Sequence, residues 1–373
     1  MPSYDKFFWG AAASAYQVEG GIDNDWSEAG FDAGKAAGHY NRFEEDFDLA
    51  KSLGHNVHRF SIEWSRIEPE EGKFSQKEIE HYQKVIDALR ERRMEPFVTL
   101  WHFTNPVWFS KIGGWKNKNA AQYFERYVDF AARNLKEVKF WLTVNEPLVY
   151  AKNAYFSGIW PPGKQSFFDL FSVIAHFVNA HRLSYEKIHQ HILGARVGIA
   201  KNNIYFDEEK SWHWLKRIAE YWWNEYFLNK ISKHQDFIGL NYYFHKHIEG
   251  LKFSPEKAHS VSDLGWGIFP EGLYFVLREL KKYQKPIYIT ENGLADAKDE
   301  KRSQFIKDHI FWMKKAMAEG IDVQGYFHWS LLDNFEWDKG FKPRFGLVEV
   351  DYKILSRKIR PSAYDYKKII EQS

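Results

Sequence analysis

The sequence predicts an α/β protein folded as a single (β/α)₈ TIM barrel. Short apolar, β-branched or aromatic runs alternate with longer amphipathic stretches, and eight such runs can be found. No tandem repeat, low-complexity segment or linker interrupts the 373 residues. Strands that alternate with helices favour a parallel sheet with crossover helices, and eight of them favour a closed barrel. We therefore expect one domain over residues 1–373.

The strand candidates are short runs of high β-propensity that end at turn-forming residues. The connections after the strands, such as Asp333–Pro343, are rich in Gly, Asn, Asp and aromatic residues, as functional loops often are. In chain order the strands are Phe7–Ser14, Asn56–Ile62, Pro96–His102, Phe140–Asn145, Val197–Lys201, Phe237–Tyr243, Pro286–Thr290 and Gln324–Trp329.

The helix candidates lie between these runs. Ser75–Arg93 begins with a capping box of Ser75 and Glu78, and its apolar residues form one stripe. Similar amphipathic patterns cover Asn119–Leu135, Phe167–Gln190, Trp212–Ile231, Glu271–Tyr283 and Arg302–Glu319.

Composition excludes several classes of partner and site. The 52 basic and 50 acidic residues give a net charge of +2, which provides no reason to expect nucleic acid or an anionic membrane as a partner. No apolar run of about 18 residues is present, so no membrane span is expected. The run Phe7–Tyr16 lacks the flanks of a signal peptide. The chain has no cysteine, which excludes disulfides and thiolate sites and is compatible with the cytoplasm, the location we expect.

Histidine spacing does not predict a metal. His189 with His191, and His245 with His247, come without a third ligand at a suitable spacing. We expect neither a metal nor a cofactor.

Aromatic residues make up 18% of the chain. Such a content suits a large core filled with rings, and it equally suits a cleft lined with flat apolar faces that bind sugars. Composition leaves both interpretations open.

Two carboxylates stand at matching positions of the predicted barrel. Glu146 ends the run of the fourth strand and Glu291 that of the seventh, and active sites of barrels lie at the C-terminal ends of the strands. Glycoside hydrolysis needs one protonated and one ionised carboxyl group, roughly 5 Å apart in a retaining enzyme. Taken singly, each is as readily a solvated loop residue or a helix cap.

Three neighbours could complete such a site. Arg59 could keep a carboxylate ionised, and Asn145 could donate a hydrogen bond to a sugar hydroxyl. Each also has a structural interpretation, as an internal ion pair and a turn residue respectively. His102 is as easily a core histidine.

Motifs along nearly the whole chain resemble glycoside hydrolase family 1, the β-glucosidase family. They include FFWGAAASAYQVEGG, TVNEP, GLNYY, ITENG and HWSLLDNFEWDKGFKPRFGLVEVD, between about residues 7 and 365. The resemblance implies that Glu146 is the general acid and then the base, and that Glu291 forms the glycosyl-enzyme ester. No metal or cofactor is implied.

The resemblance also implies roles for the surrounding residues. Tyr243 would hydrogen-bond Glu291, with Arg59 and Asn241 in the same network, and Trp266 would lie near the aglycone. The residues in contact with the non-reducing sugar would be Gln17, His102, Asn145 and Glu336 at the hydroxyls, Trp337 beside Glu336, and Trp329 as the stacking floor.

The chain departs from the family in three places. The connection between Trp212–Ile231 and the next strand is very short, and the region Asp25–Gly38 looks trimmed. Phe103 stands where many members have Trp. Glu336 and Trp337 are present, which implies unphosphorylated sugars, and the presence of Glu146 implies ordinary O-glycosides.

We therefore expect an exo-acting, retaining β-glycosidase that hydrolyses small β-glycosides or short β-linked oligosaccharides. Glucosides are the first expectation, and galactosides and fucosides are side activities. A transglycosylase would use the same residues, and a non-catalytic sugar-binding barrel would keep the fold. The sequence leaves the oligomeric state open.

Overall fold

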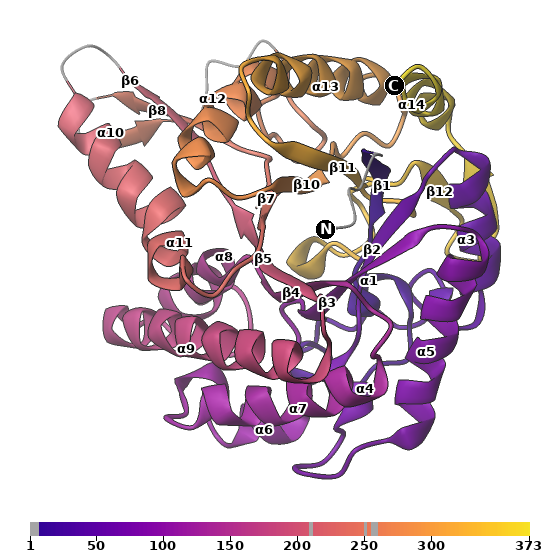
Figure 1. Cartoon of the computed structure of the whole chain (residues 1–373), viewed down its shortest axis with the longest axis vertical. Helices are drawn as coiled ribbons and strands as arrows, with labels where there is room; N and C mark the ends of the chain where they lie inside the picture. Colours follow the sequence, from indigo (N-terminus) through magenta and orange to yellow (C-terminus); the bar gives the residue numbers. More distant parts are fainter. Residues whose placement is uncertain (1–6, 209–211, 250–251, 255–259) are drawn as a thin grey trace.

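The structure, a computed structural model, describes residues 7–208, 212–249, 252–254 and 260–373. Eight strands, all paired in parallel, close into a barrel in the order β1-β11-β10-β7-β5-β4-β3-β2. Helices surround this ring (Figure 1). The barrel strands are β1 Phe8–Ala12, β2 Val57–Ser61, β3 Glu95–Trp101, β4 Phe140–Asn145, β5 Arg196–Asn202, β7 Ile238–Asn241, β10 Ile287–Asn292 and β11 Val323–Trp329. The predicted (β/α)₈ barrel is confirmed.

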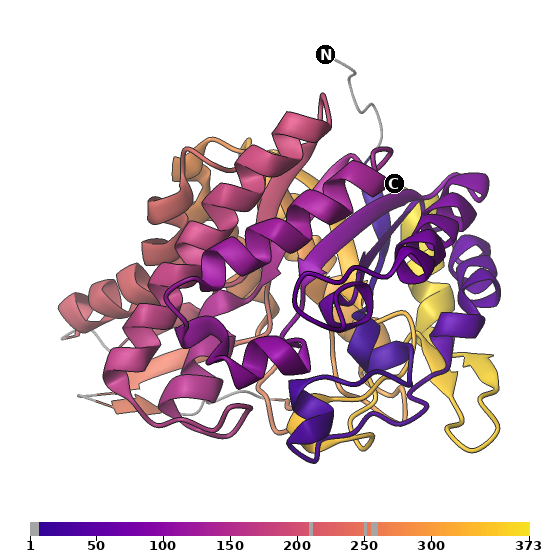
Figure 2. The same cartoon turned by 90° about the horizontal axis from the view of Figure 1, so that it is seen from below.

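Long helices cover the outside of the barrel, and the strands run obliquely between them (Figure 2). Their apolar faces pack on the strands in one large core. The long helices are α3 Phe43–Ser52, α5 Gln76–Glu91, α7 Ala120–Asn134, α9 Phe167–His191, α12 Pro270–Leu280, α13 Arg302–Ala318 and α14 Pro361–Glu371.

Short helices occupy the connections. They are α1 Ala15–Val18, α2 Asp25–Glu28, α4 Trp64–Ile67, α6 Val107–Lys111 and α8 Pro147–Ala151, with single turns at η1 His39–Asn41, η2 Gly114–Lys116, η3 Lys152–Phe156, η5 Lys281–Tyr283 and η6 Trp337–Lys339. Among the described residues, no helix has the length and apolarity needed to cross a membrane.

The predicted helix Trp212–Ile231 has an irregular middle. It consists of α10 His213–Ala219, the π-helical segment η4 Glu220–Glu225 and α11 Tyr226–Ile231, which follow one another without a break. The predicted helix Glu271–Tyr283 likewise ends in the 3₁₀ turn η5.

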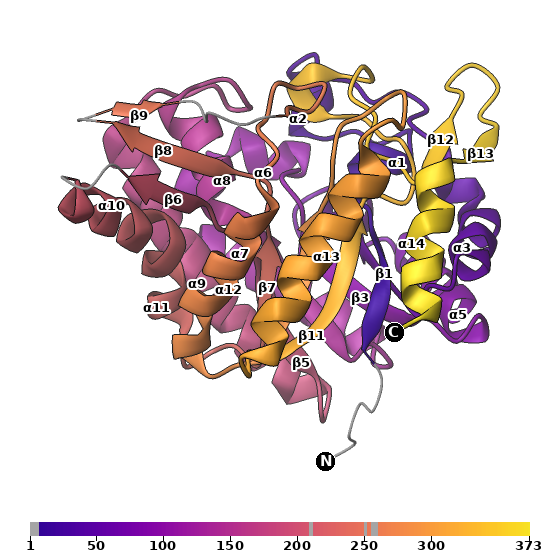
Figure 3. The ribbon, with the colours of Figure 1, turned by 90° about the horizontal axis from the view of Figure 1, so that it is seen from above.

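Two small sheets lie outside the barrel. Strands β6 Tyr205–Glu208, β8 His245–Glu249 and β9 Lys252–Ser254 form a three-stranded sheet, and β12 Val348–Val350 pairs antiparallel with β13 Arg357–Ile359. In Figure 3 the first sheet extends from one side of the barrel and the second lies near α14. Neither sheet was predicted from the sequence.

Aromatic rings fill the interior of the barrel. Phe97 on β3 stacks on Phe140 on β4, with centroids 4.4 Å apart and planes at 13°. Phe8, Phe237 and Tyr288 meet this pair edge-on or tilted. The interior is a packed core, as expected for an eight-stranded barrel. Part of the high aromatic content is thus structural.

Candidate active site

Glu146 and Glu291 line one cavity of about 210 Å³. Glu146 directly follows β4 and Glu291 is the penultimate residue of β10, so both stand at C-terminal ends of barrel strands. The backbone of Glu146 is left-handed, with φ at 42°, and its N–H donates to the carbonyl of Ala200 on the neighbouring β5, 2.8 Å away. Both side chains are buried.

Glu291 is held by a cation and a hydroxyl. Arg59, on β2, donates to Oε1 of Glu291, and the Tyr243 hydroxyl donates to Oε2 at 2.8 Å. Burial raises the pKa of Glu291, whereas the charge of Arg59 and the Tyr243 hydrogen bond lower it. These two partners favour the ionised form, which a nucleophile requires.

Glu146 has neutral hydrogen-bond partners instead. Oε1 accepts from the amides of Asn241 at 2.8 Å and Asn202 at 3.3 Å. Burial, followed by the charge of Glu291, raises the pKa of Glu146 to about 8, against the lowering effect of Asn241, Lys201 and Arg59. Glu146 is therefore mostly protonated at neutral pH, as an acid catalyst must be.

A network behind the two carboxylates ties them together. Arg59 also donates to Oδ1 of Asn145 at 2.7 Å, and Asn241 donates to the same oxygen at 3.2 Å. Asn145 Nδ2 lies 3.1 Å from Nε2 of His102. Burial holds the pKa of His102 well below its usual value, so the ring is neutral. Its Nδ1 has no hydrogen-bond partner among the described residues.

Glu336 brings a third carboxyl group to the cavity. Burial raises its pKa to about 8, with the charges of Glu291 and Asp338 next in importance. Gln17 lies behind it, and its amide donates to the Phe335 carbonyl at 2.8 Å and to Glu336 at 3.4 Å. A partly protonated Glu336 can both donate to and accept from sugar hydroxyls.

Flat rings form the walls around these carboxyl groups. The His102 ring is nearly parallel to those of Trp329 and Trp337, at centroid distances of 5.8 and 6.0 Å. Phe103 packs against Trp160 and Trp337, at 5.0 and 5.1 Å. Such faces suit the C–H surfaces of a sugar, so the aromatic residues serve this cavity as well as the core.

Apolar side chains also line the cavity. Trp266 packs against Phe244 with centroids 4.8 Å apart, and Leu264, Val149 and Ile159 lie on the same cavity wall. Asp338 and Lys339 form an ion pair at the cavity, and Asp338 also accepts from Nε1 of Trp160 at 2.9 Å.

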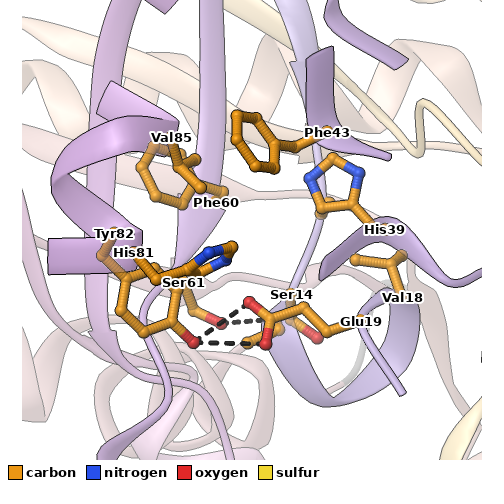
Figure 4. A pocket seen from close by; sticks show the side chains of 12 residues that line it. Ser14, Val18, Glu19, His39, Phe43, Phe60, Ser61, His81, Tyr82 and Val85 are labelled. Atoms are coloured by element: carbon orange, nitrogen blue, oxygen red, sulfur yellow. Dashed lines mark hydrogen bonds between the residues drawn. The ribbon is translucent and has the colours of Figure 1, made fainter. Parts of the chain in front are cut away.

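A separate small pocket lies beside α1, the helix that carries Gln17 (Figure 4). Its volume is about 10 Å³, room for a single water at most. Tyr82 donates to Glu19 at 3.0 Å, and Arg66 pairs with Glu19 at 2.9 Å. These contacts hold the end of α1, the helix that carries Gln17.

The structure brings the predicted site residues together in two layers. Gln17, Arg59 and Asn241 lie behind the cavity wall, in contact with the residues that form it. The wall itself contains His102, Asn145, Glu146, Tyr243, Trp266, Glu291, Trp329, Glu336 and Trp337.

Sequence analysis missed Asn202, although it stands at the end of β5 and donates to Glu146. Asn202 could have been found by the same feature that identified Glu146, its position at the C-terminal end of a predicted strand. Among the described residues, no group of three His, Asp or Glu side chains is arranged to hold a metal.

Comparison with known proteins gives consistent matches over the whole chain. The family model for glycosyl hydrolase family 1 matches residues 2–212 and 206–373. The chain is 33% identical to β-glucosidase A of Thermotoga maritima, over 99% of this chain and 98% of that protein. That alignment spans 440 positions, so the relative carries segments that this chain of 373 residues lacks.

Solved structures of glycosidases also match the chain over nearly its whole length. A β-glycosidase from Pyrococcus horikoshii superposes with a TM-score of 0.92 at 37% identity, covering 98% of this chain and 93% of that chain. The Thermotoga maritima β-glucosidase in complex with glucoimidazole also gives 0.92, at 31% identity and 98% coverage of both chains.

Proposed function

The chain belongs to glycosyl hydrolase family 1 and is a retaining β-glycosidase, and from this premise we propose that Glu146 is its acid/base and Glu291 its nucleophile. We also propose that residues 1–373 act as one catalytic domain. The difference between the hydrogen-bond partners of the two carboxyl groups supports this assignment. Arg59 and Tyr243 bind Glu291, whereas the side-chain partners of Glu146 among the described residues are the amides of Asn241 and Asn202.

The assignment leads to a two-step reaction. Glu291 attacks the anomeric carbon while Glu146 gives its proton to the departing glycosidic oxygen, which leaves a glycosyl ester on Glu291. Water then attacks the same carbon, the ester bond breaks with its electron pair returning to Glu291, and Glu146 takes the proton of the water. Both carboxyl groups end in their starting states.

The cavity supports an exo-acting enzyme for small β-glycosides or short β-linked oligosaccharides. Its volume of about 210 Å³ lies below the roughly 300–1,000 Å³ of common ligand pockets, which favours a single sugar ring. Glu336, His102 and Asn145 offer polar groups for the hydroxyls, and Trp329 and Trp337 offer flat faces. Glucosides are the first choice, with galactosides and fucosides as side activities.

The sugars are proposed to be unphosphorylated O-glycosides. The charge of Glu291 raises the pKa of Glu146, and the charges of Glu291, Asp338 and Glu146 raise that of Glu336. A phosphate dianion would add further negative charge there and would be repelled.

The enzyme class bears differently on the two alternative functions. The enzyme class sets aside a non-catalytic sugar-binding barrel, whereas a transglycosylase remains compatible because a second sugar can replace water in the second step.

The cytoplasm remains the predicted location, since a chain without cysteine needs no oxidising compartment.

Two variants test the proposed roles with nitrophenyl and alkyl β-glucosides. Glu291→Gln should abolish turnover of every substrate. Glu146→Ala should retain much more activity on 2,4-dinitrophenyl β-glucoside than on an alkyl glucoside, because a good leaving group needs no acid. Azide, which needs no base, should accelerate Glu146→Ala. Equal losses on both substrates, or an active Glu291→Gln, would overturn the assignment.

A further inference from the structure

Lys201 is a buried lysine beside the acid/base that the reaction above does not use. It lies on β5 and is 1% exposed. Its two neighbours in the strand both contact Glu146: the carbonyl of Ala200 accepts the backbone N–H, and the amide of Asn202 donates to Oε1.

The side chain of Lys201 also fixes Asn202. Its ammonium donates to the backbone carbonyl of Asn202 and lies 5.6 Å from the centroid of the Trp223 ring. Trp223 in turn donates from Nε1 to Oδ1 of Asn202 at 3.4 Å. The Asn202 amide is therefore oriented toward Glu146 from both its backbone and its side chain.

The charge of Lys201 has one acidic counterpart. Among the described residues Lys201 forms no ion pair, and an unpaired buried charge is costly. Burial lowers the pKa of Lys201 to about 7, and the charge of Glu146 acts in the opposite direction. The lysine is thus most favourably charged when Glu146 is ionised. Of the other groups that face Glu146, Glu291 raises its pKa, and Asn241 and Arg59 lower it.

We propose, on the basis of the acid/base role of Glu146, that Lys201 is a positioning residue that stabilises ionised Glu146 through its charge and through Asn202. The ionised form is needed in the second step, when Glu146 accepts the proton of the attacking water. Lys201 therefore promotes hydrolysis of the glycosyl ester, while it limits how far the pKa of Glu146 rises for the first step.

Two variants remove the charge of Lys201, and one of them keeps a hydrogen-bond donor. Lys201→Met removes both, and Lys201→Gln keeps an N–H donor without the charge. Lys152→Met is the matched control, because Lys152 lies over the same Trp223 ring at 5.8 Å, on η3. Titration with 2-deoxy-2-fluoro-β-glucosyl fluoride counts the folded, competent sites of each preparation.

Both Lys201 variants should shift the alkaline limb of kcat/KM upward by about 0.5 pH unit or more, since the loss of a nearby cation raises the pKa of the acid. On 2,4-dinitrophenyl β-glucoside, whose ester hydrolysis limits turnover, kcat should fall about 5-fold with a parallel fall in KM. Azide should restore kcat, and Lys152→Met should match the wild type.

If the competent Lys201 variants keep the wild-type alkaline limb of kcat/KM and the wild-type kcat, the proposed role of Lys201 is contradicted and the proposed function is not. The same holds if Lys152→Met has equal effects. If instead the fluoro sugar fails to trap the wild type, or Glu146→Gln keeps the wild-type alkaline limb, the proposed function itself fails.

Discussion

At the scale of single residues, Arg59 decides which carboxyl group is ionised. It is fully buried and donates to both Glu291 and Asn145. A neutral side chain at this position would leave Glu291 with the Tyr243 hydroxyl as its remaining partner among these contacts. The burial that raises the pKa of Glu291 would then be opposed by the Tyr243 and Asn241 hydrogen bonds without the charge of Arg59.

Arg59→Met should therefore lower kcat/KM about 100-fold or more and move its acid limb to higher pH, because the nucleophile must be ionised. Tyr243→Phe, which removes only a hydrogen bond, should move the limb in the same direction by less. The pH dependence of kcat/KM on an aryl glucoside measures both. An acid limb that stays in place in Arg59→Met would show that Arg59 does not control the nucleophile.

Glu336 and Asp338 offer a matched pair of acidic residues in one cavity. Asp338 already accepts from Trp160 and pairs with Lys339. Within the described part of the chain, the side chain of Glu336 has the long contact from Gln17 as its one hydrogen bond, which leaves its oxygens available to a sugar. Glu336→Gln should reduce kcat/KM on aryl glucosides about 100-fold, and Asp338→Asn about 3-fold or less. Comparable losses in both variants would remove the special role of Glu336.

Most of the reactive residues could be predicted because strand ends are visible in the sequence. Glu146 and Glu291 each follow an apolar run that stops at Pro or Gly. Asn202 was missed because the predicted strand stopped at Lys201, one residue before β5 ends. That Gln17 lies behind Glu336 could not be predicted, since the position depends on the loop after β11, far along the chain.

At the scale of elements, the ends of β10 and β11 approach too closely for a side chain at Gly293. A Cβ there would meet the carbonyl oxygen of Trp329 at 1.8 Å. Gly293 thus allows the strand that carries Glu291 to lie beside the strand that ends in Trp329.

Gly293→Ala should lower the free energy of unfolding by about 2 kcal/mol or more and also reduce kcat, because Glu291 or Trp329 must move. Gly320→Ala is the control. Gly320 has a positive φ of 78° and open space around it, so only about 1 kcal/mol of strain and unchanged kcat are expected. Denaturant unfolding and kcat measure the two effects. Full activity in a folded Gly293→Ala would contradict the close-approach argument.

The barrel strands could be predicted, but the added elements could not. Most barrel strands are rich in apolar, β-branched or aromatic residues, because both of their faces are buried. By contrast, β6 and β8 bury only a small cluster with Ile204, Phe206 and Ile248, and their pairing depends on loops after two different strands. The π-helical turn η4 could not be predicted from the sequence either, since its composition resembles that of the helix around it. It places Trp223 and Asn224 toward β5 and the loop that follows.

At the scale of the whole molecule, buried ionisable groups set the pH dependence of stability. Burial raises the pKa of Glu146 and Glu336 to about 8 and that of Asp25 and Glu63 to about 7. Their contribution to stability is present at low pH and is lost as pH rises through these values. Buried or partly buried histidines act oppositely: His55, His58, His81, His102, His181, His309 and His328 have lowered pKa values and cost stability below their usual pKa of 6.5.

The two effects together predict maximal stability near pH 6.5. As pH rises from 6.5 to 8.5 the unfolded-state histidines become neutral as well, and the carboxyl groups lower stability, partly offset by Lys201, whose pKa burial lowers to about 7. Because the carboxyl groups are more numerous, Tm should fall by about 3 °C or more. Glu146→Gln should reduce that fall, because one of the strongest contributors is gone. Scanning calorimetry over pH 5–9 tests this expectation. A Tm that rises from pH 6.5 to 8.5 would contradict the assigned pKa directions.

The identity of the nucleophile is tested most directly by trapping the glycosyl ester. The enzyme is incubated with 2-deoxy-2-fluoro-β-glucosyl fluoride, digested and analysed by tandem mass spectrometry. The structure predicts one added fluoroglucosyl group, on Glu291 in the segment ITENG. A label on Glu146 or Glu336, or an unlabelled enzyme that still turns over glucosides, would contradict it.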